Sequence, residues 1–546
     1  MKKTVISSFL ALCVMVNVVA QTQSGRIQKQ LSIYNQVMRE LDANFVDTLS
    51  YETINNAAIK AMLYYTDPYT VYFPPEKTNV LQQMTTGKYA GVGSTITQLD
   101  DTVFFADPFA DKPAYKAGIK AGDAILSIDG EKVIGMSSAD VSSRLRGKIG
   151  TTLQVKVKRH GVAKPLTMNI TREQIQTPSV SYNALLDNNY GYIHFDDFTE
   201  NSSSEFHAAL ESLAARAELK GLIIDLRGNP GGIVGEAAKI LSNFIDEGTA
   251  VVVTKRHDEV LRTYKTPYAP QWRDLPLVVL VDDDTASASE IVAGTLQDLD
   301  RAVIMGQRTF GKGLVQSVRA IEGGGNLKVT VAKYYIPSGR CIQAIDYSQR
   351  TDDGKPYYMP DSLTHEYTTA HGRVVRDGGG IKPDVEIKTA EDGGSIAYRL
   401  SQDQQFFRFA NIFVAKHPTI EPAASFVVSD TIMRQFTEYL KNIDYKYTSF
   451  SAKYAEEMKR ALKYDGLLDS CSVELEALES KLNPPLEQAL AIDDHYVRES
   501  LAMEILNRYY SHHGTYAYYV RNDLAIRTAL QYLTDPRKMS EVLNPK

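Results

Sequence analysis

Residues 282–316 read DDDTASASEIVAGTLQDLDRAVIMGQRTFGKGLVQ and follow a purely apolar run, LVVLV, at 277–281. The apolar run predicts a buried strand that ends in an acidic turn. Apolar residues at helical spacing follow this turn: Ile291, Val292, Leu296 and Leu299. They predict a helix that begins near Ser287. A second strand, AVIMG, then leads into a turn around Lys312. The stretch therefore predicts a strand–helix–strand unit of an α/β sheet.

The same alternation of strands and helices extends on both sides of this stretch. Upstream lie a strand YGYIHF, a helix over residues 201–217, and a strand KGLIIDLR that ends in the turn GNPGG. The runs AVVVT, PLVVLVD and RAVIMG, of which the last two belong to the stretch quoted above, predict buried strands, and NLKVTVAKYYIP predicts a longer strand. Together they favour an α/β domain with a mixed or parallel central sheet.

The flanking regions have different patterns. Residues 24–65 have helical spacing, whereas a region that ends near residue 170 consists of short alternating strands with Gly-rich turns. Beyond about residue 396 the chain is helical and rich in charge and tyrosine. The length of 546 residues fits several domains, each with a core of its own.

The N-terminus begins with two lysines and an apolar run that ends in small residues at Ala20. This pattern predicts a signal peptide cleaved near Ala20, and hence an exported, periplasmic protein without a membrane span in its mature form. A short membrane anchor and a lipoprotein modified at Cys13 are the alternatives. The net charge of −6 and the absence of a basic stripe argue against a nucleic-acid partner.

Two features of the opening stretch could carry chemistry. A serine at the start of a helix has free backbone N–H groups beside it, which an acyl-transfer oxyanion needs. A helix cap at Ser287 and a solvated loop lysine at Lys312 are the simpler interpretations. The run GQRTFGK also approaches a phosphate-binding loop, but Gly313 replaces the hydroxyl residue and a β-like segment follows.

Other catalytic signatures do not occur. The sequence contains no G-x-S-x-G, no S-x-x-K and no H-E-x-x-H, and its ten histidines are scattered. No metal or organic cofactor is expected. If the chain is a serine hydrolase, we expect a base other than histidine.

The blocks TASASEIVAG and TFGKGLVQ closely resemble the carboxy-terminal processing peptidases, or tail-specific proteases. This resemblance implies Ser287 as nucleophile, Lys312 as base and Gln316 as the residue that orients it, with Ser289 structural. A lysine can accept a proton only if its surroundings lower its pKa from about 10.4. Because adjacent carboxylates would oppose this, we expect Asp282–Asp284 to face solvent.

The block GLIIDLRGNPGG resembles the same family and implies an oxyanion site. One N–H would come from Ala288 and the other from Gly231 or Gly232, between which the sequence does not decide. A tight strand-to-helix turn without a catalytic role is the structural alternative.

Residues 89–172 resemble a PDZ domain through PAYKAGIKAGDAILSIDG. The resemblance implies that a Gly-rich loop holds the carboxylate of a bound C-terminus. Here that loop is Tyr89, Ala90, Gly91, Val92 and Gly93, which differs from the family at Tyr89-Ala90.

The resemblance implies a multidomain α/β protein whose protease core is of the ClpP/crotonase type, with an inserted PDZ domain. The expected division is a signal peptide (1–20), an N-terminal helical region (21–88), a PDZ domain (89–172), an α/β protease core (173–395) and a C-terminal helical domain (396–546).

The expected function is an endopeptidase that captures free C-termini of proteins or peptides and cleaves them. The resemblance also implies a homodimer or higher homo-oligomer and leaves room for a regulatory adaptor. A catalytically silent PDZ scaffold on the same fold is the alternative.

Overall fold

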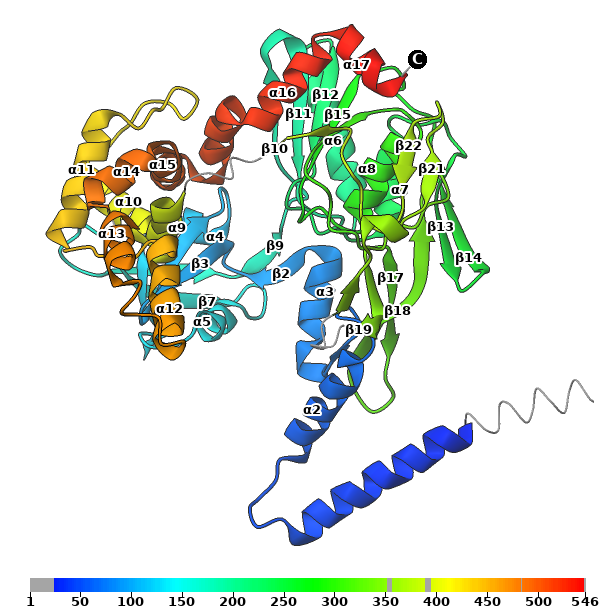
Figure 1. Ribbon diagram of the computed structural model, residues 1–546, viewed down its shortest axis with the longest axis horizontal. Helices are drawn as coiled ribbons and strands as arrows, with labels where there is room; N and C mark the ends of the chain where they lie inside the picture. The colour runs from blue at the N-terminus through cyan, green and yellow to red at the C-terminus, as the bar shows by residue number, and fades with distance from the viewer. Residues whose placement is uncertain (1–23, 351–355, 388–393, 483, 545–546) are drawn as a thin grey trace, which may run out of the picture. The chain divides into compact units, whose positions relative to one another are not determined.

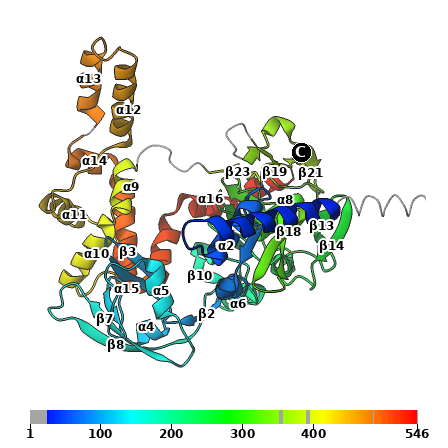
Figure 2. The same cartoon turned by 90° about the horizontal axis from the view of Figure 1, so that it is seen from below.

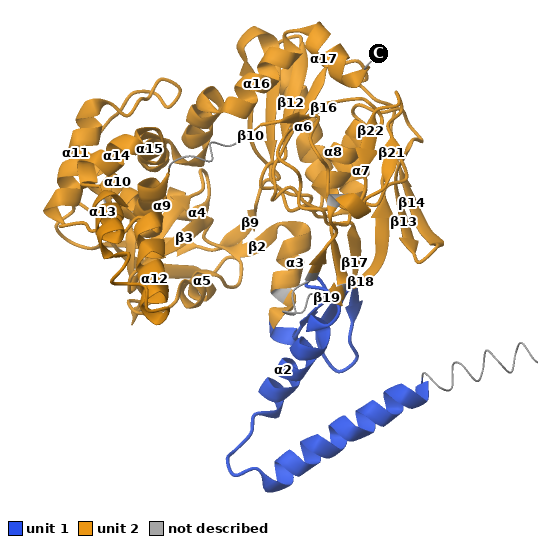
Figure 3. Cartoon of the chain, viewed as in Figure 1, with its two compact units in different colours: residues 1–76, 318–329 blue, residues 77–317, 330–546 orange. Residues whose placement is uncertain are grey.

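The computed structural model describes residues 24–350, 356–387, 394–482 and 484–544. The chain divides into two compact units (Figure 3): one comprises the residues up to Glu76 with Val318–Val329, the other Lys77–Ser317 and everything from Thr330 onward. The predicted signal peptide lies outside the described residues. Among those that are described, no helix is both long and apolar enough to cross a bilayer.

The first unit contains the predicted N-terminal helices. One helix spans residues 24–44, and α2 spans Tyr51–Tyr64 after its N-cap Ser50, whose side chain accepts the N–H of Thr53. A short strand, β1 (Val71–Phe73), pairs antiparallel with the first residues of β18. Much of the apolar surface of the first helix is exposed, including Leu31 and Val37.

The region after residue 77 forms a small, strongly curved sheet of short strands (Figure 1), as the alternating pattern predicts. The sheet order is β3-β4-β5-β7-β8, with β6 beside β5. The strands are β3 (Ser94–Leu99), β4 (Thr102–Pro108), β5 (Ala124–Ile128), β6 (Glu131–Lys132), β7 (Thr152–Lys158) and β8 (Leu166–Thr171). The helices α3 (Thr78–Thr86), α4 (Pro113–Lys116) and α5 (Ser138–Leu145) accompany them. Alternate residues of β7 point into the core, which explains the sequence TLQVKVK.

The central sheet has the order β10-β11-β12-β15-β16-β23, and its strands are parallel except β10. The strands are β10 (Val180–Leu186), β11 (Tyr190–Phe195), β12 (Gly221–Asp225), β15 (Leu277–Val281), β16 (Val303–Gly306) and β23 (Val385–Glu386). The helices between them are α6 (Ser202–Ala214), α7 (Val234–Leu241) and α8 (Ala288–Asp298). The predicted α/β core is therefore confirmed.

Both faces of the central sheet are buried, which is why its strands are apolar throughout. Ile193, Ile224 and Val279 pack with α6, α7 and α8 in one cluster. Their neighbours Ile223 and Val278 belong to a second cluster with Ile526 and others from α16 (Leu524–Leu533). Figure 1 shows α16 and α17 (Pro536–Leu543) over the strands, on the side away from α6, α7 and α8.

A second sheet holds β13 (Ala250–Arg256), β14 (Glu259–Lys265), β17 (Leu314–Ala320) and β18 (Asn326–Tyr335). Within the larger unit, β13 pairs antiparallel with β14 and with the last residues of β18. Short strands follow that the sequence did not predict: β19 (Ile345–Arg350), β20 (Pro356–Tyr358), β21 (Glu366–Thr368) and β22 (Val374–Arg376).

The tail is helical, as predicted. It contains α9 (Ser395–Gln402), α10 (Gln405–Lys416), α11 (Asp430–Asn442), α12 (Phe450–Tyr464), α13 (Ser472–Leu482), α14 (Leu486–Ile492) and α15 (Asp494–Asn522). Figure 2 shows α12 and α13 side by side as a hairpin. The helix α15 is interrupted at Ser511, which has φ 52° and ψ −166°. Before this kink it contacts the small curved sheet, where the side chain of Asn507 donates to the carbonyl of Ala106.

Candidate active site

Ser287 lies immediately before α8, at the turn that leads from β15 into the helix. Its backbone has φ 58° and ψ −114°, and only 7% of its surface is exposed. A non-glycine residue in this region is strained, and such strain concentrates at functional sites. A strained strand-to-helix turn also presents the nucleophile in α/β hydrolases. Ser287 thus has the backbone conformation of a nucleophile turn, although the sequence around it lacks the flanking glycines of G-x-S-x-G.

Glu290 joins the turn of Ser287 to the turn of Lys312. Its carboxylate is fully buried; Oε2 accepts the backbone N–H of Ser287 at 2.8 Å and that of Lys312 at 2.9 Å. Oε1 accepts the N–H of Gly311 at 2.8 Å and the hydroxyl of Thr309 at 2.5 Å. Burial raises the pKa of Glu290, and these hydrogen bonds oppose the rise without cancelling it. The sequence did not predict that Glu290 binds both turns, although Ser287-x-x-Glu290 has the spacing of a capping box.

Lys312 is half-buried and lies between two glycines that the fold requires. A side chain at Gly311 would place its Cβ 2.4 Å from Cβ of Ala344, and one at Gly313 would lie 2.9 Å from N of Gln343. Gln343 and Ala344 also hold the lysine turn through hydrogen bonds. The N–H of Gly313 donates to Oε1 of Gln343 at 2.7 Å, and the N–H of Ala344 donates to the carbonyl of Gly311 at 2.9 Å. The glycines therefore let Gln343 and Ala344 pack directly against the lysine turn.

Gln316 lies on β17, four residues after Lys312 in the sequence. Its amide nitrogen donates to Oγ1 of Thr330 on β18 at 3.1 Å, which fixes the side chain against the neighbouring strand. From the same strand, the hydroxyl of Tyr334 donates to the carbonyl of Ser287 at 3.0 Å. The strand β18 thus contacts both the predicted nucleophile and the predicted orienting residue.

Gly231 is buried against the turn that contains Ser287, whereas the next residue, Gly232, is exposed. A Cβ at Gly231 would lie 2.5 Å from the carbonyl oxygen of Ala286 and 2.7 Å from N of Ala288. The N–H of Gly231 already donates to Oδ1 of Asn229 at 2.9 Å. Within the described residues, no acceptor is seen for the N–H of Gly232 or of Ala288. These two groups are the ones available to a ligand.

Asn229, which sequence analysis did not single out, fixes the glycine turn to the start of α8. It is fully buried, and its Nδ2 donates to the carbonyl of Phe195 at 2.7 Å. Its own carbonyl accepts the N–H of Ala286 at 3.0 Å and the hydroxyl of Ser289 at 3.0 Å. Ser289 is therefore buried and committed to a structural hydrogen bond.

The three aspartates after β15 do not behave alike. Asp283 and Asp284 are exposed, as expected. Asp282 is half-buried and accepts the N–H of Gly228 at 3.0 Å and that of Thr285 at 2.9 Å. The expectation that all three face solvent is wrong for Asp282, because its carboxylate satisfies two turn N–H groups.

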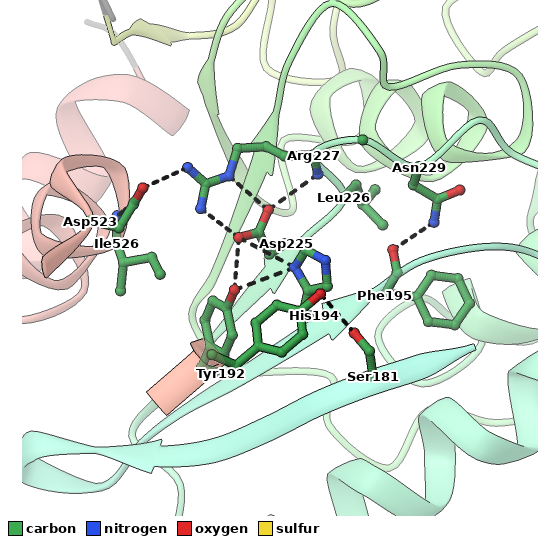
Figure 4. A network of polar contacts seen from close by, with 12 residues as sticks. Ser181, Tyr192, His194, Phe195, Asp225, Leu226, Arg227, Asn229, Asp523 and Ile526 are labelled. Atoms are coloured by element: carbon green, nitrogen blue, oxygen red, sulfur yellow. Dashed lines mark hydrogen bonds and ion pairs between the residues drawn. The ribbon is translucent and has the colours of Figure 1, made fainter. Parts of the chain in front are cut away.

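A network of charged side chains lies at the end of β12, just before the glycine turn (Figure 4). Arg227 donates to both carboxylate oxygens of Asp225, at 2.9 and 2.6 Å, and Tyr192 donates to Oδ2 of Asp225 at 2.8 Å. Asp225 is fully buried; burial opposes its charge, but Arg227 and His194 hold its pKa well below the usual range. Burial likewise opposes a charge on His194, yet its hydrogen bonds to Asp196 and Asp225 raise its pKa to about 9.

Of the predicted peptide-binding residues, all but Ala90 line a groove of about 310 Å³ between β3 and α5. The strand β3 is an edge strand, so its backbone can pair with an added strand. Tyr89, Ala90 and Gly91 do not form a loop, however: they belong to β2 (Lys88–Gly91), which pairs antiparallel with β9 (Glu173–Gln176). Only Val92 and Gly93 lie in the turn between β2 and β3.

Arg146 lies at the same end of the groove and was not predicted. Its guanidinium lies 5.1 Å from the centre of the Tyr89 ring and donates to Oε1 of Gln83 at 2.8 Å. The apolar side chains of Val92, Ile96 and Leu145 line the groove beside it. A cation next to an apolar pocket suits a chain terminus with an apolar last residue.

Three family models match the chain. The model described as "Peptidase family S41" matches residues 189–349, the "PDZ domain" model matches 90–170, and "Probable PDZ-protease, C-terminal helical domain" matches 396–533. Each range falls within one of the predicted domains, whose boundaries stay predictions.

The chain is also similar to curated proteins over about three fifths of its length. It is 33% identical over 338 residues to a carboxy-terminal-processing protease of Bartonella bacilliformis, covering 61% of this chain and 77% of the relative. The carboxy-terminal processing protease CtpA of Bacillus subtilis is 31% identical over 344 residues, covering 62% and 72%. Among solved structures, a photosystem II D1 C-terminal processing protease is 28% identical, with a TM-score of 0.35, covering 65% of this chain and 86% of that chain.

The family models, and the identity and coverage of the curated relatives, confirm the resemblance found in the sequence. The chain belongs to the carboxy-terminal processing proteases of peptidase family S41, serine proteases that here carry a PDZ domain and a C-terminal helical domain.

Proposed function

We propose that the protein is an exported endopeptidase that captures C-terminal tails in its PDZ groove and cleaves them with Ser287 and Lys312. The observation that carries this proposal is the shared carboxylate of Glu290, which accepts the backbone N–H of both residues. Two turns from different parts of the core are thereby fixed beside each other. Such fixed geometry is what a nucleophile and its base require.

In the acylation step, Oγ of Ser287 attacks the carbonyl carbon of the scissile peptide while Nζ of Lys312 takes the hydroxyl proton. The C–O bond forms, and the carbonyl π electrons move to the oxygen. When the tetrahedral intermediate collapses, the C–N bond breaks and Lys312 returns the proton to the leaving amine. An ester between Ser287 and the substrate remains.

The oxyanion of that intermediate needs two donors aimed at one point. The N–H of Ala288 begins α8, where the helix dipole also favours negative charge. For the second donor we favour Gly232 over Gly231, because the N–H of Gly231 already bonds to Asn229. In deacylation, Lys312 takes a proton from water while the water oxygen attacks the ester carbonyl carbon; the ester C–O bond then breaks, and Lys312 returns the proton to Oγ of Ser287.

Substrate capture is assigned to the groove between β3 and α5. A C-terminal tail would add as a strand to the edge of β3, with its carboxylate at Val92, Gly93 and Arg146. The apolar lining favours apolar last residues. The substrates are therefore proteins or peptides with free, mostly apolar C-termini.

Export and assembly complete the proposal. The N-terminal sequence supports cleavage near Ala20 and a periplasmic location. The exposed apolar surface of the helix over residues 24–44 supports self-association as a homodimer or higher oligomer. The mass of the protein in solution, before and after Leu31→Asp, tests the self-association.

The test of the catalytic assignment uses an unstructured substrate with an apolar C-terminus. We expect the wild-type protein to cleave it, and Ser287→Ala and Lys312→Arg to lose activity, because guanidinium cannot take the proton. Ser289→Ala should keep the chemistry while losing some stability, since its hydroxyl bonds to Asn229.

Mass spectrometry of the products locates the cleaved bonds. Equal cleavage by wild type and Ser287→Ala would remove the nucleophile assignment. Full activity of Lys312→Arg would remove the lysine base, and loss of activity in Ser289→Ala alone would move the nucleophile to that residue.

A further inference from the structure

Asp523 connects the C-terminal helical domain to the network beside the glycine turn. It stands between α15 and α16, and its Oδ2 accepts Nη1 of Arg227 at 3.0 Å across 296 residues of sequence. The two side chains are 13% and 17% exposed, so water screens the pair only weakly. Figure 4 shows Asp523 and Asp225 on opposite sides of the guanidinium.

The guanidinium of Arg227 is thus held by two carboxylates rather than one. Asp225 occupies Nε and Nη2, while Asp523 occupies Nη1. The ring of Tyr519, one turn earlier on α15, lies 5.5 Å from the guanidinium carbon. Burial opposes the charge of Arg227, but both aspartates raise its pKa. The side chain is a fixed cation with little freedom to move.

Arg227 begins the segment that carries the oxyanion glycines. The next residue, Gly228, donates its N–H to Asp282, and the carbonyl of Asn229 accepts the N–H of Ala286. These two hydrogen bonds attach the middle of the segment to the turn before Ser287. At its start, the contacts of the Arg227 side chain hold it.

We propose that Asp523 is a positioning residue for the peptidase reaction. By holding the side chain of Arg227, Asp523 keeps the segment from Arg227 to Gly232 in one conformation. In that conformation the N–H of Gly232 points at the oxyanion. The C-terminal helical domain then contributes to turnover through the side chain of Asp523. This inference rests on the proposed function of Ser287 and Lys312.

Asp523 also has a purely structural task, which must be separated from the proposed one. Its other oxygen, Oδ1, accepts the N–H of Ile526 at 2.8 Å and caps α16. Asparagine caps helices as well as aspartate does. Asp523→Asn therefore keeps the cap while it removes the charge that faces Arg227, whereas Asp523→Ala removes both.

The chain offers a matched control in Asp535, which caps α17 by accepting the N–H of Arg537 at 3.0 Å. The experiment measures kcat, KM and the thermal unfolding midpoint of the whole mature protein, with the unstructured substrate described above. The variants are Asp523→Asn, Asp523→Glu, Asp523→Ala, Asp535→Asn and Ser287→Ala.

We expect Asp523→Asn to lower kcat by about tenfold, equivalent to about 1.4 kcal/mol, at unchanged KM, and to lower the unfolding midpoint less than Asp523→Ala, which also loses the cap. KM should stay constant because capture occurs in the PDZ groove. Asp523→Glu, which restores the charge, should recover part of kcat. Asp523→Ala should lower both kcat and the midpoint, and Asp535→Asn should leave kcat unchanged.

A kcat of Asp523→Asn equal to wild type would overturn the inference. So would a loss of kcat that follows the unfolding midpoint across the variants without recovery in Asp523→Glu, because that pattern marks a cap alone. If wild type cleaves no faster than Ser287→Ala, the proposed function itself fails, and the two failures are therefore distinguishable.

Discussion

Oε2 of Glu290 accepts the backbone N–H of Lys312 at 2.9 Å, although 22 residues separate them in the chain. The same oxygen accepts the N–H of Ser287, so the carboxylate fixes the distance between the two turns. The N–H of Phe310 also donates to the carbonyl of Thr285 at 3.1 Å, so the relative placement of the proposed nucleophile and base depends on this backbone bond and on one buried acid.

Glu290→Gln should impair both catalysis and stability. The amide replaces one carboxylate oxygen by an NH₂ group, which faces two N–H donors and leaves them without an acceptor. Unsatisfied buried groups of this kind cost about 1–3 kcal/mol each. We expect kcat to fall at least about tenfold, together with a lower midpoint in denaturant unfolding. The exposed Glu247→Gln is the control, and equal behaviour of the two variants would refute the bridging role.

Gly231→Ala should abolish turnover while substrate capture persists. The residue has φ 93°, and its new Cβ would lie 2.5 Å from the carbonyl oxygen of Ala286. Relief of this clash must move the nucleophile turn, so we expect kcat to fall at least about 100-fold. Gly235→Ala, where nothing lies within 4 Å of the new Cβ, should be tolerated. Peptide binding to the groove, followed by fluorescence anisotropy, should match wild type; a near-normal kcat would contradict the close approach.

His194 should make stability depend on pH. Its folded pKa of about 9 exceeds the unfolded value near 6.5, because Asp196 and Asp225 outweigh the effect of burial; Tyr192 and Tyr516 also face the ring. A raised pKa contributes stability that is complete below about pH 6.5 and is lost as the pH rises through about 9.

The comparison is between wild type and His194→Gln in denaturant unfolding across this range. Wild type should be more stable by on the order of 3 kcal/mol near pH 6, and the difference should shrink above pH 9. The exposed His160→Gln is the control. A difference that stays constant with pH would show that His194 is not a cation in the folded protein.

Arg146→Gln should weaken the binding of C-terminal peptides. The guanidinium lies at the end of the groove next to Tyr89, where a charge-assisted hydrogen bond to the carboxylate is available. We expect about tenfold weaker binding of a peptide with a free C-terminus. The amidated peptide, which has no carboxylate, should bind both proteins equally weakly, and the exposed Lys148→Gln should behave as wild type. An equal loss for both peptides would assign Arg146 to the fold of the groove instead.

Local patterns predicted much of this structure. The strands around Ile224 and Val279 were recognisable because both faces of their sheet are buried, which makes each strand apolar along its whole length. The start of α8 was likewise marked by its serines and its apolar spacing. The family blocks named Ser287 and Lys312, the two residues that Glu290 holds together.

Features that depend on distant partners had no such signal. Asp523 reads as an ordinary helix cap, and only the fold brings it to Arg227. The backbone of Ser287 lies in a region that residue type does not predict, because the surrounding contacts enforce it. The resemblance placed a loop at Tyr89–Gly91, but this segment pairs with β9, a partner more than 80 residues away that local sequence does not reveal.

The position of α16 bears on when this enzyme becomes competent. The helix covers Ile223 and Val278 of the central sheet, yet it begins only at Leu524. A growing polypeptide can therefore contain Ser287 and Lys312, the proposed catalytic residues, while one face of the central sheet is still exposed to water. The sheet is therefore covered on both faces only once α16 has been synthesised, and we expect a chain shortened before Leu524 to expose apolar surface and to lose stability.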